Sequence, residues 1–373
     1  MSSRFNKGKI FTSTIILLFC TLLSGCAFKD IDKRTFIVGI GIDPSEKEDK
    51  KFKVTLKIAL PIGSIKQSTS PSYTYLSHDG DSISEAIRII ETHVDKALEF
   101  GQTKIIAIHE DLLINDYQSF MDYFIRRGDI QLVAWVGAAS PTAEEILKVE
   151  PSTEVASSIA LFNIFDGNGT DSPFITTTPL FEFRRNYFTK GIDAVIPLLE
   201  TNEEQSELIV NKSVILKKNS PPFKLSPTET LYFNSLFHHS SGYSFKVKEE
   251  DFIMLLNVQK MKMKYKIHTE EGKTPLVNIN INVVGTVLES SKPLSISKLD
   301  EYNKTTAKVM KKTTEDLLKK AQEEDLDPFG FGLRYRATRI NDKNTISDWE
   351  AIYPDLEFKV VFKVDLQSIG AIQ

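Results

Sequence analysis

The chain has 373 residues, of which 41% are hydrophobic and 26% are charged, as is typical of a folded globular protein and not of a disordered one. Its formal net charge is −4, and no long basic run occurs, which argues against nucleic-acid binding. The only cysteines are Cys20 and Cys26. If the first of them is removed with a leader, an intramolecular disulfide is excluded.

The first 25 residues are typical of a signal peptide. A basic segment with Arg4, Lys7 and Lys9 precedes an apolar run over residues 10–23. A helix of that length covers only about 21 Å of a hydrocarbon core about 30 Å thick, so the run is too short for a comfortable membrane span. No later segment is apolar for long enough, and we expect no other membrane-spanning segment.

Cys26 follows this apolar run in the order Leu-Ser-Gly-Cys, which resembles the bacterial lipobox. The resemblance implies cleavage before Cys26, an S-diacylglycerol on its thiol, and N-acylation with a fatty acid of the palmitate type. Burial of each acyl methylene gives about 0.8 kcal/mol, so two or three chains anchor a protein stably. The alternative is an ordinary secreted protein whose free cysteine follows its cleavage site. Loss of the basic segment leaves the mature chain at about −7.

A polar tether over residues 26–34 leads into an expected N-terminal mixed α/β domain over 35–200. Strands are predicted at 35–43 and 51–61, the latter from its period of two. A helix is predicted over 81–101, with Ser82 and Glu85 as a capping box and Gly101 as its stop. Strands and helices then alternate, up to a helix that runs from 180 to about 190, with Pro197 beyond it.

A middle domain is expected over residues 201–288 and a C-terminal α+β domain over 289–373. The middle segment predicts one or two strands, a capped helix over 226–239, and two strands joined by a turn at Glu271–Gly272. The last segment predicts a long amphipathic helix and an alternating terminal strand over 357–370. The predicted fold class is therefore α+β or mixed α/β, with three sheet-and-helix domains. In the last domain, a long helix packs against an antiparallel sheet.

The histidines form neither an HExxH motif nor a paired metal-ligand spacing. They are His78, His93, His109, His238, His239 and His268. The adjacent pair at 238–239 suggests either a metal site or, as we favour, the end of a helix or a wet turn. His109, Glu110 and Asp111 suggest either an acid/base cluster or, again favoured, a turn after a strand.

Other motifs of catalysis are also missing from the sequence. The glycines of "GIG" at 39–41 lack the rest of a dinucleotide fingerprint, and there is no Walker loop and no GxSxG elbow. "PFGFG" suggests either a binding loop or, as we favour, a tight turn that buries Phe329 and Phe331. We therefore expect no catalytic residue, no metal and no cofactor, and a role in binding or assembly.

Several segments, in order along the chain, are similar to the Ger(x)C family. They are "LLSGC", "GIGID", "DGDSISEAIRIIETHVDKALEFGQTKIIAIHEDLL", "FIRRGDIQLVAWVGAASPTAEEIL", "KKAQEEDLDPFGFG", Trp349 and "FKVVFKVDLQSIG". The resemblance implies a three-domain lipoprotein C subunit of a spore germinant receptor, lipid-anchored on the outer face of the inner spore membrane. Its partners would be the A and B subunits, which are membrane proteins, and the complex would trigger germination in response to amino acids, sugars or nucleosides. No cofactor and no nucleic acid are implied.

Two other functions are alternatives to this interpretation. A solute-binding lipoprotein that delivers a small nutrient to a transporter predicts two similar α/β lobes around a cleft. An envelope hydrolase requires a catalytic constellation that the sequence does not contain.

Overall fold

The computed structural model describes most of the chain, which divides into two compact units, residues 1–34 and residues 35–373. The described residues are 11, 12, 14, 31–60, 73–115, 117–149, 163–165, 172–202, 204, 206–218, 220–238, 243–270, 272–339 and 344–369. Cys26 and the predicted cleavage site lie outside them. In the first unit, the 3-10 helix η1 covers Ile31–Lys33. None of the helices in the described ranges combines the length and the apolar character that crossing a membrane requires.

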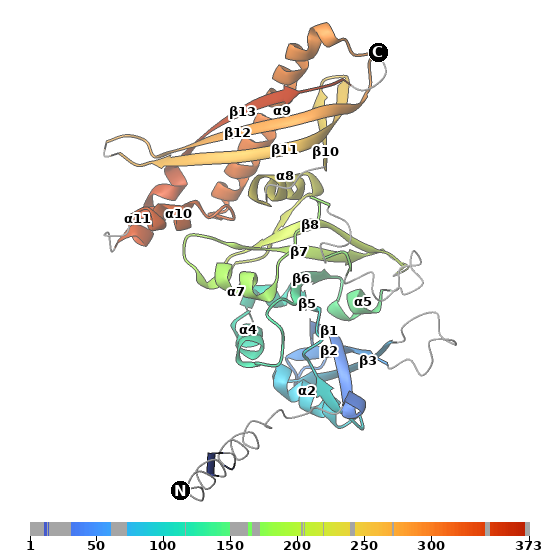
Figure 1. Ribbon diagram of the computed structural model, residues 1–373. Helices are drawn as coiled ribbons and strands as arrows, with labels where there is room; N and C mark the ends of the chain where they lie inside the picture. Colours follow the sequence, from blue (N-terminus) through green and yellow to red (C-terminus); the bar gives the residue numbers. More distant parts are fainter. Residues whose placement is uncertain are drawn as a thin grey trace, which may run out of the picture. The chain divides into compact units, whose positions relative to one another are not determined.

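The first sheet has a parallel centre and antiparallel margins (Figure 1). Over the described residues its order is β3-β2-β1-β5-β6-β7-β8-β9, and β4 also pairs with β1. The pairs β1–β5, β5–β6 and β6–β7 are parallel, whereas β2, β3, β8 and β9 join by antiparallel pairing. The bounds are β1 Arg34–Pro44, β2 Phe52–Ala59, β3 Tyr73–Gly80, β4 Ala97–Glu99, β5 Ile105–His109, β6 Trp135–Ser140, β7 Ala194–Thr201, β8 Leu208–Leu216 and β9 Phe223–Leu225.

Helices cover both faces of this sheet. Alternate residues of its central strands belong to different apolar clusters, and each cluster contains helices. Ile106 and Ile108 of β5 lie in the cluster that contains residues of α2, α3, α4 and α7, whereas Ile105 and Ala107 lie in the cluster that contains α5. The helices are α2 Ile83–Glu91, α3 Leu112–Asn115, α4 Tyr117–Arg126, α5 Ala143–Lys148 and α7 Leu180–Phe188. This layering is that of a mixed α/β architecture.

One predicted element of this region needs correction, and one strand was not predicted. The helix expected over 81–101 begins as predicted, since the Ser82 hydroxyl accepts from the amide of Glu85 at 3.2 Å. It ends at Glu91, however, and residues 97–99 form β4, so Gly101 is not its stop. Residues 194–201, to which the sequence assigned no element beyond the helix that ends near residue 190, form β7. Proline is tolerated there because the ladder with β6 begins only at Leu198.

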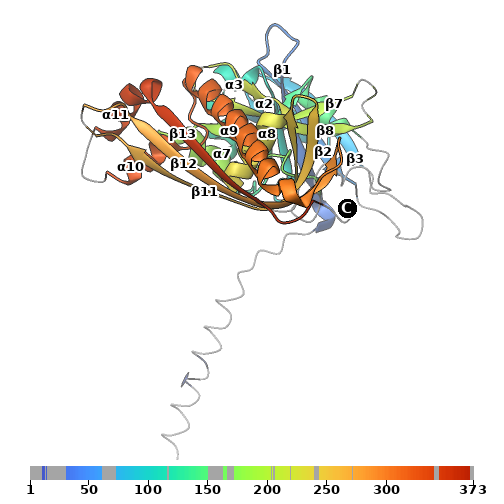
Figure 2. The ribbon, with the colours of Figure 1, turned by 90° about the horizontal axis from the view of Figure 1, so that it is seen from above.

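The second sheet has the order β10-β11-β12-β13 and carries the long helix α9 on one face (Figure 2). Its strands are β10 Tyr243–Glu249, β11 Phe252–His268, β12 Leu276–Ser290 and β13 Glu357–Leu366. β10, β11 and β12 are antiparallel, which confirms the two strands predicted within residues 251–282, while the terminal strand β13 lies parallel to β12. The associated helices are α8 Pro227–His238, η2 Ile296–Lys298, α9 Leu299–Glu323, α10 Phe331–Ala337, α11 Thr345–Ile352 and η3 Tyr353–Asp355.

The helix α9 buries one stripe and exposes the rest, as its amphipathic pattern predicts. Its buried residues recur every three or four positions: Tyr302, Thr306, Met310, Thr314, Leu317, Leu318 and Ala321. They pack on the side chains of β11, β12 and β13 that point to that face, such as Ile279 and Val360. The prediction of a long helix against a largely antiparallel sheet is confirmed, and so is the mixed α+β fold class.

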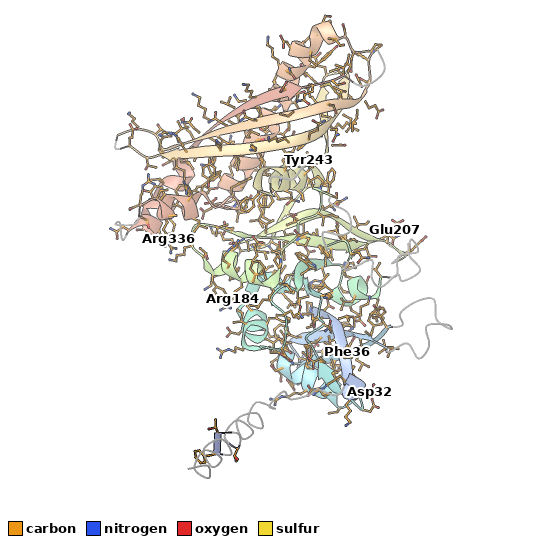
Figure 3. All side chains as sticks on the ribbon, viewed as in Figure 1. Asp32, Phe36, Arg184, Glu207, Tyr243 and Arg336 are labelled. Carbon is orange, nitrogen blue, oxygen red and sulfur yellow. The ribbon has the colours of Figure 1, made fainter. Side chains whose placement is uncertain are left out.

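The two sheets of residues 35–373 share one apolar cluster through α8. This cluster contains Val195 and Ile215 from the first sheet, Phe233 of α8 and Leu256 of the second sheet. Side chains fill the space between α8 and the neighbouring strands (Figure 3). β8 and β9, from the expected middle segment, belong to the first sheet, and β12 continues past residue 288. The division into three domains stays a prediction.

Candidate functional site

The segment from Asp327 to Gly332 is the junction between the two sheet-bearing parts. The amide of Asp193, just before β7, donates to the carbonyl of Asp327 at 3.0 Å, and the amide of Leu333 donates to the carbonyl of Gly191 at 2.6 Å. Gly330 has φ 67°, and Phe329 and Phe331 are buried on either side of it. The interpretation of "PFGFG" as a tight turn that buries its aromatic rings is confirmed.

The carboxyl group of Asp327 organises this turn from inside the protein. It accepts from the amide of Phe331 at 3.0 Å and from that of Gly332 at 2.7 Å. Burial raises its pKa to about 7, and burial also raises the pKa of the neighbouring Asp193. The hollow beside Asp193 measures only about 20 Å³, room for about one water molecule. The two acids therefore serve the junction, and the hollow that the described residues leave beside Asp193 is too small for a substrate.

The motif "GIGID" on β1 also has a structural role. Both carboxylate oxygens of Asp43 accept amides at the start of α5, from Ala143 at 2.6 Å and from Glu144 at 2.9 Å. A Cβ added at Gly39 would lie 2.9 Å from Cδ2 of Leu147, so glycine allows α5 to approach the strand. Burial raises the pKa of Asp43 in spite of these hydrogen bonds.

The histidines are spread over separate places. The amide of Asp111 donates to Nδ1 of His109 at 3.2 Å in the turn that leads into α3, while Glu110 pairs with Lys224 at 2.6 Å. This confirms the favoured turn interpretation of residues 109–111. The ring of His78 lies 6.0 Å from that of His93 between ring centres. The side chain of His238 and all of His239 lie outside the described residues, so the two interpretations of that pair stay predictions.

Nothing in the described ranges brings together three histidine, cysteine, aspartate or glutamate side chains that could hold a metal ion. A chemically distinctive surface is instead formed by a lysine array on the second sheet, on the face opposite α9. We call it the basic face and define it by nine residues from β11, β12 and β13: Lys262, Lys264, Lys266, Asn278, Asn280, Asn282, Lys359, Val361 and Lys363.

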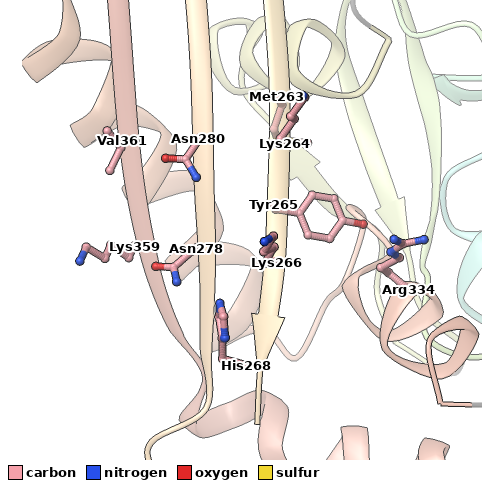
Figure 4. A pocket seen from close by; sticks show the side chains of 10 residues that line it. All are labelled: Met263, Lys264, Tyr265, Lys266, His268, Asn278, Asn280, Arg334, Lys359 and Val361. Carbon is pink, nitrogen blue, oxygen red and sulfur yellow. The ribbon is translucent and has the colours of Figure 1, made fainter. Parts of the chain in front are cut away.

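Strand register arranges the basic face in three rows, each centred on an asparagine of β12. Residues paired across neighbouring strands share a face of the sheet. The rows are Lys262–Asn282–Lys363, Lys264–Asn280–Val361 and Lys266–Asn278–Lys359. Figure 4 shows the second and third rows on three adjacent strands. The residues that alternate with these along β12 and β13, such as Ile279, Ile281 and Val360, point to the opposite face and are buried under α9.

Within the part of the chain that the structure describes, the lysines of the basic face form no ion pair with an acid. Among the described residues, no carboxylate lies within 4.0 Å of the amino group of any of the five lysines. The acids nearest in sequence on this face are Glu357 and Asp365, at the two ends of β13. Further cationic or titratable side chains, Arg334 of α10 and His268 of β11, line the same open hollow of about 980 Å³. The face is therefore strongly positive on a chain whose net charge is negative.

This face was not among the features predicted from the sequence. The alternation of "KMKMKYKIH" in β11 was a visible signal for a strand with one lysine-rich side. The pairing that places Lys359 and Lys363 beside the asparagines comes from the parallel register of β13, which no local pattern reveals.

Comparisons with known proteins agree along nearly the whole chain. Residues 28–201 match the family model described as "Spore germination protein N-terminal domain". Residues 212–370 match the model described as "Spore germination B3/ GerAC like, C-terminal". The crystal structure of the GerBC protein is similar with a TM-score of 0.57 at 18% identity, covering 88% of this chain and 97% of that one, which supports the fold. No curated protein matches.

Proposed function

This chain belongs to the GerAC-like family of spore germination proteins, and we propose that it is the lipid-anchored C subunit of a spore germinant receptor. The observation that carries the proposal is the ordered match of both family models, over residues 28–201 and 212–370. In this role the protein assembles with the A and B membrane subunits and takes part in the response to a nutrient.

The proposed subunit acts by contact and not by catalysis. The buried acids of the described residues support this role, because Asp43 caps α5 and Asp193 and Asp327 hold the junction. His109 and Glu110, the acid/base candidates of the sequence, are engaged in a turn and in an ion pair with Lys224. No cofactor is required for this function.

Lipidation at Cys26 is proposed to hold the protein on the outer face of the inner spore membrane. Two or three acyl chains give stable attachment, and the short tether over 26–34 confines the folded part to a thin layer above the bilayer. Confinement raises the effective concentration of membrane partners, so weak contacts with the A and B subunits suffice for assembly.

Affinity purification of the native protein from spore membranes, followed by crosslinking, tests the proposed assembly. We expect the A and B subunits to co-purify with this chain and to crosslink to lysines of residues 35–373. Recovery of this chain alone, while A and B remain associated with each other in the same extract, would overturn the proposal.

A further inference from the structure

We propose that the basic face binds the anionic phospholipid surface of the membrane that carries the protein. The inference rests on the proposed function in one respect: membrane attachment brings the face near a bilayer. The ligand is thus a plane of phosphate groups, and the contact sets how the folded part lies on the membrane.

The spacing of the face suits such a plane. Side chains on one side of a strand repeat about every 6.6 Å, and neighbouring strands lie about 4.8 Å apart. The three rows therefore form a shallow grid, with lysines on the two flanking strands and amide groups between them. Asparagine side chains donate as well as accept hydrogen bonds, so the centre of the grid can also contact phosphate or glycerol oxygens.

The charge of the face implies an anionic ligand from outside the chain. Lys262, Lys264 and Lys266 lie at alternate positions of β11, and Lys359 and Lys363 lie across the asparagine strand. Like charges that are close on one sheet face destabilise it. Because these lysines form no ion pair among the described residues, their mutual repulsion lowers the stability of the free protein, and a bound anionic surface relieves that repulsion.

The residue types favour a lipid surface over an acidic protein. Protein interfaces are depleted in lysine and are centred on buried aromatic or arginine residues. The basic face contains one apolar residue, Val361, and carries its charge on lysines. Lysine binds phosphate as a point charge, and clustered lysines near a bilayer gain about 1 kcal/mol each from anionic lipids.

The net charge of the mature chain gives the face a role in orientation. At about −7, the protein as a whole is repelled by an anionic bilayer. A single basic side is attracted within a Debye length of about 10 Å. The attached protein is therefore expected to turn this side toward the lipid, which determines the surfaces that remain available to partner subunits.

The test uses residues 35–373, which contain every member of the three apolar clusters and form a unit of their own. This fragment lacks Cys26 and carries no lipid, so the measurement is independent of lipidation. Its partition is measured by cosedimentation with vesicles of phosphatidylglycerol and phosphatidylcholine, and with vesicles of phosphatidylcholine alone. We expect binding to the anionic vesicles only, weakening as salt is added.

Two variants that each lose three positive charges distinguish the contribution of the basic face to vesicle binding from that of the total charge. In the face variant, Lys264→Gln, Lys266→Gln and Lys359→Gln are combined. In the control, Lys292→Gln, Lys304→Gln and Lys312→Gln alter exposed lysines off the basic face, two of them on the outer side of α9. We expect the face variant to lose on the order of 100-fold in partition and the control to lose less than about threefold. Thermal unfolding of both variants checks that they fold.

Two results would overturn the proposal. One is equal weakening by both variants, which would indicate attraction by total charge alone. The other is absence of binding to anionic vesicles at low salt. If the face variant then also reduced co-purification of the A and B subunits, the face would be assigned to an acidic protein surface instead.

Discussion

Asp193 and Asp327 form a reciprocal pair of hydrogen bonds across the junction of the two sheet-bearing parts. The amide of Asp193 donates to the carbonyl of Asp327 at 3.0 Å, and the amide of Asp327 donates to the carboxylate of Asp193 at 2.6 Å. The two residues are 134 positions apart in sequence. A few hydrogen bonds, surrounded by buried apolar side chains, thus fix the junction.

Gly332→Ala is expected to destabilise this junction. An added Cβ would lie 2.4 Å from Nε1 of Trp349 and 2.8 Å from the Cα of Gly191, so both must move. Overpacking of this kind lowers the free energy of unfolding by about 1–3 kcal/mol. Because the Cα of Gly191 is backbone and cannot rotate away, we expect a loss near the upper end of this range. Denaturant unfolding measures the loss.

The matched control is Gly128→Ala, since nothing lies within 4 Å of a Cβ added there. Its stability should change by less than about 0.5 kcal/mol. Equal losses in the two variants would mean that the contact between Gly332 and Trp349 does not constrain the junction.

Asp327→Asn is expected to flatten the pH dependence of stability in mildly acidic solution. The pKa of Asp327 is raised to about 7 by burial, against an ordinary value of about 3.9. Between these values the native state binds more protons than the unfolded state, so stability falls as pH rises, by up to about 1.4 kcal/mol per pH unit. Asparagine cannot ionise, so the variant lacks this contribution.

Denaturant unfolding at several pH values between about 4 and 7 checks this prediction. The control is Asp355→Asn, which changes an exposed acid in η3. Wild-type protein and the control should show the same slope, and Asp327→Asn a smaller one. A slope for Asp327→Asn as steep as that of wild type would show that this carboxyl does not carry the effect.

Sequence patterns predicted elements whose faces differ in polarity, such as α2, β11 and α9, because periodicity reports burial directly. They failed where a local signal conflicts with the fold. The helical spacing of residues 81–101 continues past Glu91, yet α2 ends there and residues 97–99 form β4. The roles of Asp43 and Asp327 and the rows of the basic face depend on pairing between distant segments, which no local window contains.

The receptor-subunit account also predicts that no small nutrient stabilises residues 35–373 strongly. A solute-binding lipoprotein closes two similar lobes around its ligand, whereas the two sheets described here differ in strand order and direction. A ligand at 100 times its Kd would stabilise such a protein by about 2.7 kcal/mol. A thermal-shift screen with amino acids, sugars and nucleosides should therefore show no large shift, and one large, saturable shift would favour the solute-binding alternative.

Cys26→Ser is expected to leave residues 35–373 folded and to weaken receptor function. The reason is the loss of effective concentration when the anchor is removed. Germination rates of spores that carry the variant measure the effect, and circular dichroism of the purified protein checks the fold. Wild-type rates on every nutrient that the receptor serves would show that the anchor is dispensable.

Mass spectrometry of the amino-terminal peptide of the native protein tests the central claim most directly. The account predicts a chain that begins at Cys26, carries a diacylglycerol on the thiol and an acyl group on the amine, and stays on membranes washed with salt. A free thiol at Cys26, in protein that salt alone releases from the membrane, would contradict it.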